Sequence, residues 1–256
     1  GIFGGHVRIY QNVSETWTKI GDDIDGEAAF DFSGRSVSLS SDGSVVAIGA
    51  LYNDGNGSNS GHVRIYQNVS GTWTKIGDDI DGEAAGDYSG NSVSLSSDGS
   101  VVAIGAYYND ENGTQSGHVR IYQNVSETWT KIGDDIDGEA AGDNSGRSVS
   151  LSSDGSVVAI GADYNDGNGS NSGHVRIYQN VSGAWTKIGD DIDGEAAGDL
   201  SGSSVSLSSD GSVVAIGAYG NDGNGSNSGH VRLYQNVSGT WTKIGDDIDG
   251  EAGSDY

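Results

Sequence analysis

The chain of 256 residues has no Cys, so it can form neither a disulfide nor a thiolate metal site. Its formal net charge of −25 argues against nucleic acid as a partner, and no apolar run is long enough to insert into a membrane. The 44 glycines and the many Ser, Asn and Asp residues favour turns and strands over helices. The first residues, GIFG, suggest a processed or truncated start.

A unit of 56 residues organises the chain. The motif GHVRIY or GHVRLY begins at Gly5, Gly61, Gly117, Gly173 and Gly229, and TWTKIG or AWTKIG follows it each time. The longer motif SVSLSSDGSVVAIGA begins only at Ser36, Ser92, Ser148 and Ser204. One repeat domain is therefore predicted, with a leading half unit over 1–35 and full units over 36–91, 92–147, 148–203 and 204–256.

Each full unit is predicted to contain four short strands. In the unit 36–91, SVSLS and HVRIYQN alternate apolar and polar residues, and Asp42-Gly43 favours a tight hairpin turn. VVAIGA is a continuous apolar run, typical of a strand buried on both faces. The predicted strands cover 36–40, 45–50, 62–68 and 72–77.

This pattern predicts an all-β fold. Four antiparallel strands per unit, repeated in tandem, are typical of a β-propeller, here with four full blades and a leading half blade, about five blades in all. A β-solenoid is the alternative, although tandem GGxGxD nonapeptides are absent. In a propeller, the stretch GDDIDGEAAGD, 77–87, crosses between blades on the same face as the loop 52–61.

The stretch DYSGNSVSLSSDGSVVAIGAYYNDENGTQSGHVRIYQN, 87–124, resembles an FG-GAP repeat, the blade of integrin α-subunit propellers and of many bacterial and algal surface proteins. The resemblance covers nearly the whole chain and implies a propeller. The family's calcium loop of DxDxDG type is replaced here by the short turn SDGS, which cannot surround Ca²⁺ with about six to eight oxygens. The FG position is filled by Phe32 and Gly34, Tyr88 and Gly90, Asn144 and Gly146, and Leu200 and Gly202. The GAP position is filled, always without proline, by Gly49-Ala50, Gly105-Ala106, Gly161-Ala162 and Gly217-Ala218.

Each crossing carries five carboxylates, which should make one face strongly acidic. Three interpretations are open: a Ca²⁺ site, a solvated loop whose Asp residues cap turns, or structural Asp residues that brace adjacent blades, for which Asp31 and its copies are the best candidates. No cofactor is required, and Ca²⁺ is the one candidate ion. The candidate metal ligands are Asp25, Glu27, Asp31, Asp81, Glu83, Asp87, Asp137, Glu139, Asp143, Asp193, Glu195 and Asp199.

The repeated histidines and tryptophans are predicted to have structural roles. A ring formed by His6 and its four copies would be too wide to share one ion, so packing or hydrogen bonding is expected. Trp17 and its copies are expected to pack between blades rather than stack on a sugar.

The repeats differ mainly at positions 30, 32, 35, 51 and 52 and their equivalents. These positions flank the loops of the acidic face. Either they face a ligand, or they are exposed and free to vary. The candidates for facing a ligand are Tyr52, Tyr107, Tyr108, Tyr164 and Tyr219.

Sequons of the form Asn-x-Ser/Thr recur in two loops of every unit. They would be glycosylated only in a secretory pathway that attaches N-glycans, and turn chemistry also explains them. The candidate glycosylation sites are Asn12, Asn56, Asn68, Asn112, Asn124, Asn168, Asn180, Asn224 and Asn236.

No Ser/His/Asp set stands out, and copies in every blade are poor evidence for one active site. We therefore expect no enzyme but an extracellular or cell-surface adhesion or structural module, able to self-associate or to bind a surface protein or glycan. The alternative is a lectin-like propeller that binds carbohydrate or Ca²⁺ on its acidic face. The half blade could remain a hairpin, pair with another chain at its open edge, or belong to a longer array.

Overall fold

The computed structural model describes residues 4–254, which form 24 short β-strands and no helix. Each full unit gives one antiparallel sheet. The leading half unit gives two small pairs, β1–β4 and β2–β3. The strands of the half unit are β1 (His6–Val7), β2 (Tyr10–Val13), β3 (Thr16–Lys19) and β4 (Ile24–Asp25).

The four full sheets repeat the same order of strands. The first contains β5 (Ser36–Leu39), β6 (Val45–Ala50), β7 (His62–Val69), β8 (Thr72–Lys75) and β9 (Ile80–Asp81). The second contains β10 (Ser92–Leu95), β11 (Val101–Ala106), β12 (His118–Val125), β13 (Thr128–Lys131) and β14 (Ile136–Asp137). The third contains β15 (Ser148–Leu151), β16 (Val157–Ala162), β17 (His174–Val181), β18 (Ala184–Lys187) and β19 (Ile192–Asp193). The fourth contains β20 (Ser204–Leu207), β21 (Val213–Ala218), β22 (His230–Val237), β23 (Thr240–Lys243) and β24 (Ile248–Asp249).

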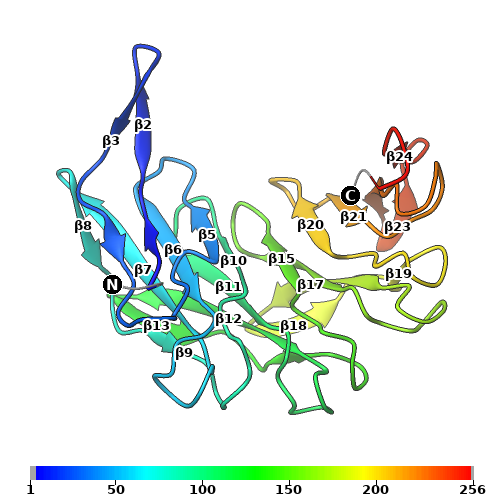
Figure 1. The fold of residues 1–256 in the computed structure, drawn as a ribbon, viewed down its shortest axis with the longest axis horizontal. Coiled ribbons are helices and arrows are strands. Elements are labelled where there is room, and N and C mark those ends of the chain that lie inside the picture. The colour runs from blue at the N-terminus through cyan, green and yellow to red at the C-terminus, as the bar shows by residue number, and fades with distance from the viewer. Residues whose placement is uncertain (1–3, 255–256) are drawn as a thin grey trace.

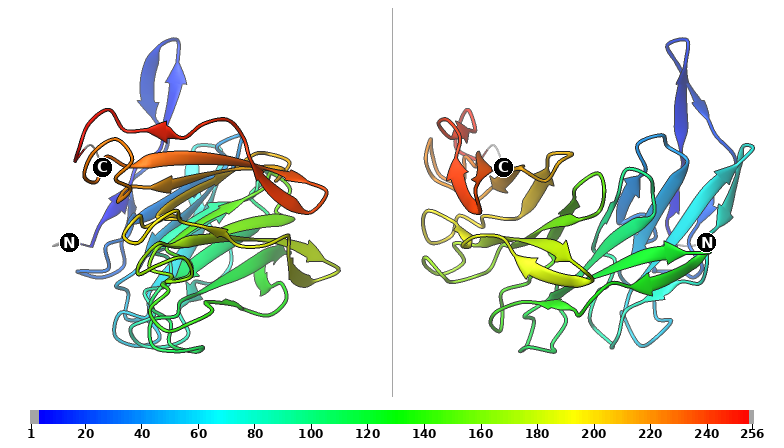
Figure 2. Two further views of the ribbon diagram at one scale, coloured as in Figure 1. Left: turned by 90° about the vertical axis from the view of Figure 1, so that its right-hand side faces the viewer. Right: turned by 180° about the vertical axis from the view of Figure 1, so that it is seen from behind.

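The sheets stand one after another along an open arc (Figure 1), with β5, β10, β15 and β20 on its inner side. Views from two further directions show the β2–β3 hairpin projecting from one end and the fourth sheet ending the other (Figure 2). The all-β, four-stranded antiparallel repeat is confirmed. The described sheets do not close into a ring, so the arrangement is propeller-like.

Each crossing contains a short fifth strand that the sequence did not predict. In the first full sheet, β9 turns back and pairs antiparallel with the start of β7, so that His62 lies opposite Asp81 and Val63 opposite Ile80. The equivalent pairing occurs in the other three sheets. The backbone of the crossing is therefore anchored to the sheet it leaves.

The hairpin turns between the first two strands are built from local hydrogen bonds. In the turn before β6, Asp42 accepts hydrogen bonds from the backbone N–H of Ser44 and from the hydroxyl of Ser40. Gly43 has φ +71°, the left-handed conformation that such turns need. These bonds lower the pKa of the Asp42 carboxyl to about 2, so its acidity serves the turn.

The hydrophobic core lies between neighbouring sheets. One face of the first full sheet, including Ala47 and Ile65, packs against Leu95, Val102 and Ile104 of the second. The same type of cluster joins the second sheet to the third and the third to the fourth. Because each sheet buries both faces only when it has two neighbours, the fold depends on the tandem arrangement.

The two glycine motifs meet at these junctions. A Cβ on Gly49 of β6 would collide with the backbone oxygen of Gly90, which precedes the next sheet. Gly105 and Gly146, and Gly161 and Gly202, form the same contact. The repeated glycines are therefore needed where the backbones of adjacent sheets approach each other closely.

Candidate active site at the inner ends of the sheets

A row of aromatic side chains lies beside the first two strands of the first two full sheets, near the starts of β5 and β10 and the ends of β6 and β11. Consecutive ring centroids lie between 4.3 and 5.8 Å apart. The rings come from positions just before the first strand and just after the second strand of a sheet. These positions meet because the two strands are antiparallel neighbours. The aromatic row consists of Phe32, Tyr52, Tyr88, Tyr107 and Tyr108.

Arg147 extends the aromatic row toward the third sheet. Its guanidinium carbon lies 5.1 Å from the centroid of the Tyr107 ring, a cation–π arrangement. Its Nε lies 3.6 Å from Oδ2 of Asp163, the residue that follows β16. Arg147 thus joins an aromatic surface to a buried carboxyl group.

Asp163 has an environment unlike that of the other acids near the arc's inner side. The residue is only 1% exposed, and its Oδ1 has no hydrogen-bond partner within residues 4–254. Burial raises the pKa of Asp163 to about 6, and the charge of Arg147 opposes this shift. A carboxyl group that titrates near neutral pH can both accept and return a proton.

Arg147 lines a cleft of about 470 Å³. The cleft is also bordered by Tyr107, Tyr108, Tyr164 and Asn144. The volume falls in the range of about 300–1,000 Å³ typical of small-molecule sites. Polar groups beside aromatic rings suit a ligand that carries both hydroxyl groups and apolar faces.

Four of the five tyrosines predicted to face a ligand belong to these features. Tyr52 belongs to the aromatic row, Tyr107 and Tyr108 belong to both the row and the cleft, and Tyr164 belongs to the cleft. Tyr219 is half exposed. Burial raises the pKa of Tyr219 most, and the negative charge of Asp163 raises it further.

The sequence did not single out Arg147 or Asp163 as functional residues. Both occupy positions at which the repeats differ: Asn91 and Ser203 stand at places equivalent to Arg147, and Leu51, Tyr107 and Tyr219 at places equivalent to Asp163. The variation between repeats was the one feature of the sequence that pointed to these two positions. It did not show that the two positions touch.

The acids predicted to bind a metal divide into three groups. Asp31, Asp87, Asp143 and Asp199 are buried, and each accepts hydrogen bonds from a backbone N–H three residues earlier and from an Asn of the next sheet. For Asp87 these donors are Ala84 N and Asn109 Nδ2, at 2.9 and 3.2 Å. The carboxylate oxygen that accepts both bonds is the same one, Oδ2, so this group braces adjacent sheets.

The second group is formed by Asp25, Asp81, Asp137 and Asp193, the last residues of the short fifth strands. Their backbone oxygens accept hydrogen bonds from the Arg64, Arg120, Arg176 and Arg232 guanidinium groups of the following sheet. Burial raises the pKa of the Asp81, Asp137 and Asp193 side chains. Their side chains belong to none of the metal-competent clusters within residues 4–254.

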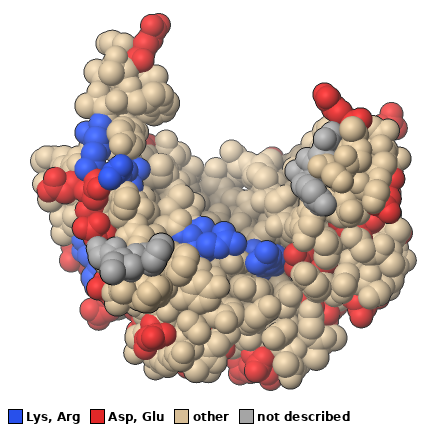
Figure 3. All heavy atoms as spheres, in the orientation of Figure 1, with Lys and Arg blue, Asp and Glu red and all other residues tan. Residues whose placement is uncertain are grey.

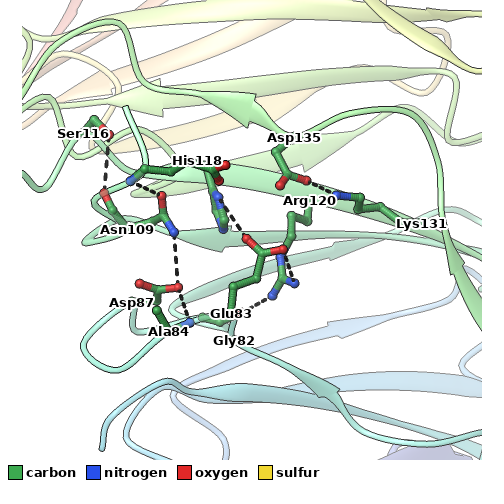
Figure 4. A network of polar contacts seen from close by, with 12 residues as sticks. Gly82, Glu83, Ala84, Asp87, Asn109, Ser116, His118, Arg120, Lys131 and Asp135 are labelled. Atoms are coloured by element: carbon green, nitrogen blue, oxygen red, sulfur yellow. Dashed lines mark hydrogen bonds and ion pairs between the residues drawn. The ribbon is translucent and has the colours of Figure 1, made fainter. Parts of the chain in front are cut away.

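The third group, Glu27, Glu83, Glu139 and Glu195, does lie in clusters that could hold a metal ion. Each Glu is joined there by a buried His and an Asp that the sequence did not propose, such as Glu27 with His62 and Asp79. The fullest cluster contains Glu83, Glu111, His118 and Asp135. Figure 4 shows Glu83, His118 and Asp135 of this cluster. The repeated histidines were predicted to pack or hydrogen bond. The structure places four of them beside carboxylates as well.

The sequons lie at two kinds of turn. Asn68 and Asn124, the second-last residues of β7 and β12, accept hydrogen bonds through Oδ1 from Gly71 N and Glu127 N of the turns that follow; Asn12, Asn180 and Asn236 occupy the equivalent strand positions. Asn56 instead donates from Nδ2, the nitrogen that would carry a glycan, to the backbone oxygens of Gly82 and Glu83. Asn112, Asn168 and Asn224 make the same bond to a crossing. This second set therefore holds a crossing in place.

The charges are distributed unevenly over the surface. On the face shown, acidic atoms lie mostly along the outer edges of the arc, and basic atoms lie near the middle below the hollow and at the foot of the projecting β2–β3 hairpin (Figure 3). A positive patch in a strongly acidic molecule favours approach of a ligand with negative or developing negative charge.

Tandem antiparallel sheets arranged around an arc, with their inner strands side by side, define a propeller-type repeat protein. The FG-GAP repeat matches residues 24–66, 80–122, 136–178 and 192–234, and the chain belongs to this family. No curated protein matches the sequence.

Two solved structures are similar in fold. The periplasmic gluconolactonase of Pseudomonas aeruginosa matches with a TM-score of 0.63 and 14% identity, over 97% of this chain and 65% of that chain. The hydrazine synthase of Kuenenia stuttgartiensis matches with a TM-score of 0.52 and 14% identity, over 84% of this chain and 48% of that chain. The chain thus spans less than two thirds of either protein, and the likeness at this identity concerns the fold.

These comparisons correct two expectations. The prediction of a non-catalytic adhesion or structural module is wrong, and so is the prediction that the chain is not an enzyme. The two structures of similar fold named above are a gluconolactonase and a hydrazine synthase rather than adhesion modules. The physical reason for the error is that the expectation rested on near-identical repeats, and a repeated fold does not by itself decide function.

Proposed function

We propose that the chain is a hydrolase of small sugar-type lactones, with its active site at the cleft beside Arg147. The observation that carries the proposal is the position of Arg147, which borders a cleft lined by tyrosines and lies 3.6 Å from Asp163, a buried carboxyl with a raised pKa behind it. The gluconolactonase of similar fold supplies the substrate class.

The geometry supports a division of roles. The Arg147 guanidinium, held over the Tyr107 ring, would bind the lactone carbonyl oxygen and stabilise the negative charge that develops when water attacks. Asp163 would accept the proton of that water. When the ring C–O bond breaks, the same carboxyl would return the proton to the departing ring oxygen, giving a hydroxy acid.

The aromatic surroundings support the proposed type of substrate. A sugar ring presents C–H groups on its faces and hydroxyl groups at its edge. Tyr107 and Tyr108, with centroids 4.3 Å apart and tilted by 47°, offer an apolar surface, and Asn144 offers an amide at the same cleft. The side-chain oxygen of Asn144 has no hydrogen-bond partner among the described residues and can accept one from a ligand.

The test is a pH-stat assay with gluconolactone as substrate. We expect release of acid above the spontaneous rate, rising with pH through about 6 as Asp163 ionises. Asp163→Asn should lower kcat by at least about 100-fold, since general acid–base catalysis typically contributes about 10²–10⁴-fold. Arg147→Lys should lower kcat because Lys lacks the planar guanidinium.

The repeats provide a matched control. Arg35 is equivalent to Arg147 and directly precedes the first full unit, in which Leu51 stands where the third full unit has Asp163. Arg35→Lys should leave the rate unchanged. Acid release equal to that of buffer alone, or an Asp163→Asn variant as active as the parent, would contradict the proposal.

We also propose that further sheet structure completes the propeller, from another copy or from a longer chain, and that the protein works outside the cell. The first point is supported by apolar side chains such as Leu39 and Ile248, exposed at the two ends of the arc. Among residues 4–254 there is no helix that is long and apolar enough to cross a membrane. Acidic clusters that could hold a metal are present, and Ca²⁺ binding by the crossings stays a prediction.

A further inference from the structure

The Glu–His–Asp clusters recur at fixed positions in the repeat. Each joins a Glu of the crossing that precedes a sheet, a His at the start of that sheet's third strand, and an Asp of the crossing that follows. In the second sheet, Glu111 of the long loop adds a fourth group, where the other full units have Gly55, Gly167 and Gly223. One ligand atom from each of Glu83, Glu111, His118 and Asp135 lies within 4.8 Å of the others.

The surroundings of His118 distinguish this cluster from an ordinary acidic patch. It is fully buried, and neither ring nitrogen has a hydrogen-bond partner among the described residues. Its Nδ1 lies 3.9 Å from Oε2 of Glu83, beyond hydrogen-bond distance (Figure 4). A buried imidazole nitrogen without a partner is costly, and a bound cation would satisfy it.

The carboxylates are oriented by neighbouring basic groups. Oε1 of Glu83 lies 3.4 Å from Nη1 of Arg120, which leaves Oε2 facing His118. Oδ1 of Asp135 lies 2.7 Å from Nζ of Lys131. In the first-sheet copy, Asp79 pairs with Lys75 through Oδ1 and faces His62 with Oδ2. Such outer partners are typical of metal sites, where they fix the ligands and balance their charge.

The ligand atoms lie within 4.8 Å of one another, so they must move closer together to hold an ion. Two ligands about 2.1 Å from one tetrahedral ion lie about 3.4 Å apart, so the 3.9 Å between Nδ1 of His118 and Oε2 of Glu83 is slightly long. Glu83 and Glu111 are exposed side chains that can move, whereas His118 is fixed by β12. The rigid nitrogen and the mobile carboxylates suit binding with little change in the fold.

We propose that Glu83, Glu111, His118 and Asp135 bind a divalent transition-metal ion of the zinc class. One imidazole with three carboxylates favours such an ion over Ca²⁺, which prefers oxygen ligands alone. The ion would link the crossing before the second sheet, β12 and the crossing after it. The three-ligand copies at His62, His174 and His230 bind the same class of ion more weakly.

The experiment uses the full chain, freed of metal with EDTA and then titrated with Co²⁺ and Zn²⁺. We expect visible absorption bands of protein-bound Co²⁺, displaced by Zn²⁺, with one tight site by calorimetry. Melting temperature should rise with Zn²⁺ because the ion binds the folded state. Ca²⁺ at the same concentration should not displace Co²⁺.

Two exposed positions provide variants that keep the fold intact. Glu83→Gln should weaken Co²⁺ binding at the tight site at least about tenfold. Glu111→Gly recreates the loop of the other units, so it should reduce the tight site to the affinity of the three weaker ones. His118→Gln should abolish the tight site. His6→Gln is the matched control because His6 is exposed and outside every cluster of the described residues.

Three results would overturn the proposal: no Co²⁺ bands, Co²⁺ binding that Glu83→Gln and Glu111→Gly leave unchanged, or displacement of Co²⁺ by equimolar Ca²⁺. The second would place the ion elsewhere on the acidic surface, and the third would indicate a site of oxygen ligands alone. If His118→Gln fails to fold, the two exposed variants decide the outcome. Asp163→Asn should keep full Co²⁺ binding, so the test is separate from that of lactone hydrolysis.

Discussion

The environment of Asp163 affects stability as well as the proposed chemistry. Its carboxyl group has a pKa of about 6 in the folded chain because it is buried, compared with an ordinary value of 3.8. Between these two values the folded state binds more protons than the unfolded state. The stability contributed by the protonated group is therefore complete below pH 3.8 and is lost as pH rises through 6.

This linkage predicts that Asp163→Asn stabilises the protein at neutral pH. Asn resembles the protonated carboxyl in shape and carries no charge to bury. A shift of this size corresponds to about 3 kcal/mol of unfolding free energy at pH 7.5. At pH 4 the two proteins should unfold at nearly the same urea concentration. Equal stability at pH 7.5 would mean that the group is not buried as described.

At the scale of the element, the crossing is held by side-chain bonds to both of the sheets it joins. Asn56 of the first full sheet donates to Gly82 and Glu83, and Asn109 of the second donates to Asp87. The crossing thus has fixed geometry despite its polar sequence. This arrangement lets it present Glu83 to His118.

Removal of the brace should loosen the junction between two sheets. Asp87→Ala leaves the buried amide of Asn109 and the N–H of Ala84 without their acceptor, so we expect a loss of about 1–3 kcal/mol in unfolding free energy. Asp87→Asn keeps one side-chain oxygen and should cost less. Urea denaturation of the two variants measures the difference, and an Ala variant as stable as the Asn variant would show that these bonds contribute little.

At the scale of the whole molecule, the same residue type has opposite surroundings in the middle and at the end of the arc. Ile136 on β14 is 5% exposed and packs against the third sheet, whereas Ile248 on β24 is 60% exposed. The open arc therefore leaves apolar side chains of its terminal sheet uncovered.

The difference in burial predicts that replacing Ile136 or Ile248 by Ala lowers the unfolding free energy by different amounts. Ile136→Ala should destabilise the protein by about 2–5 kcal/mol because it creates a cavity between sheets. Ile248→Ala should cost less than about 0.5 kcal/mol. Melting temperatures of the two variants, measured at several protein concentrations, give the comparison. A large, concentration-dependent cost for Ile248→Ala would show that a second copy covers this face.

Strand positions followed from the sequence because local chemistry specifies them. Alternating residues, the continuous run VVAIGA and the Asp42-Gly43 turn each have one favoured conformation, and 56-residue copies repeat it. The fifth strands were missed because Ile80-Asp81 has no strand pattern of its own and pairs only where β7 offers a free edge. The contacts at the junctions between sheets could not be predicted for the same reason, because the contacting residues come from different units.

The sequence by itself determined the repeat, the all-β class and the acidic character, since these depend on composition and on short-range periodicity. Only the tertiary structure decided which side chains meet. It joined Arg147 to Asp163 across two strands, and Glu83 to His118 across two sheets. It also buried Asp163, and burial, which no sequence pattern reports, raises its pKa to about 6.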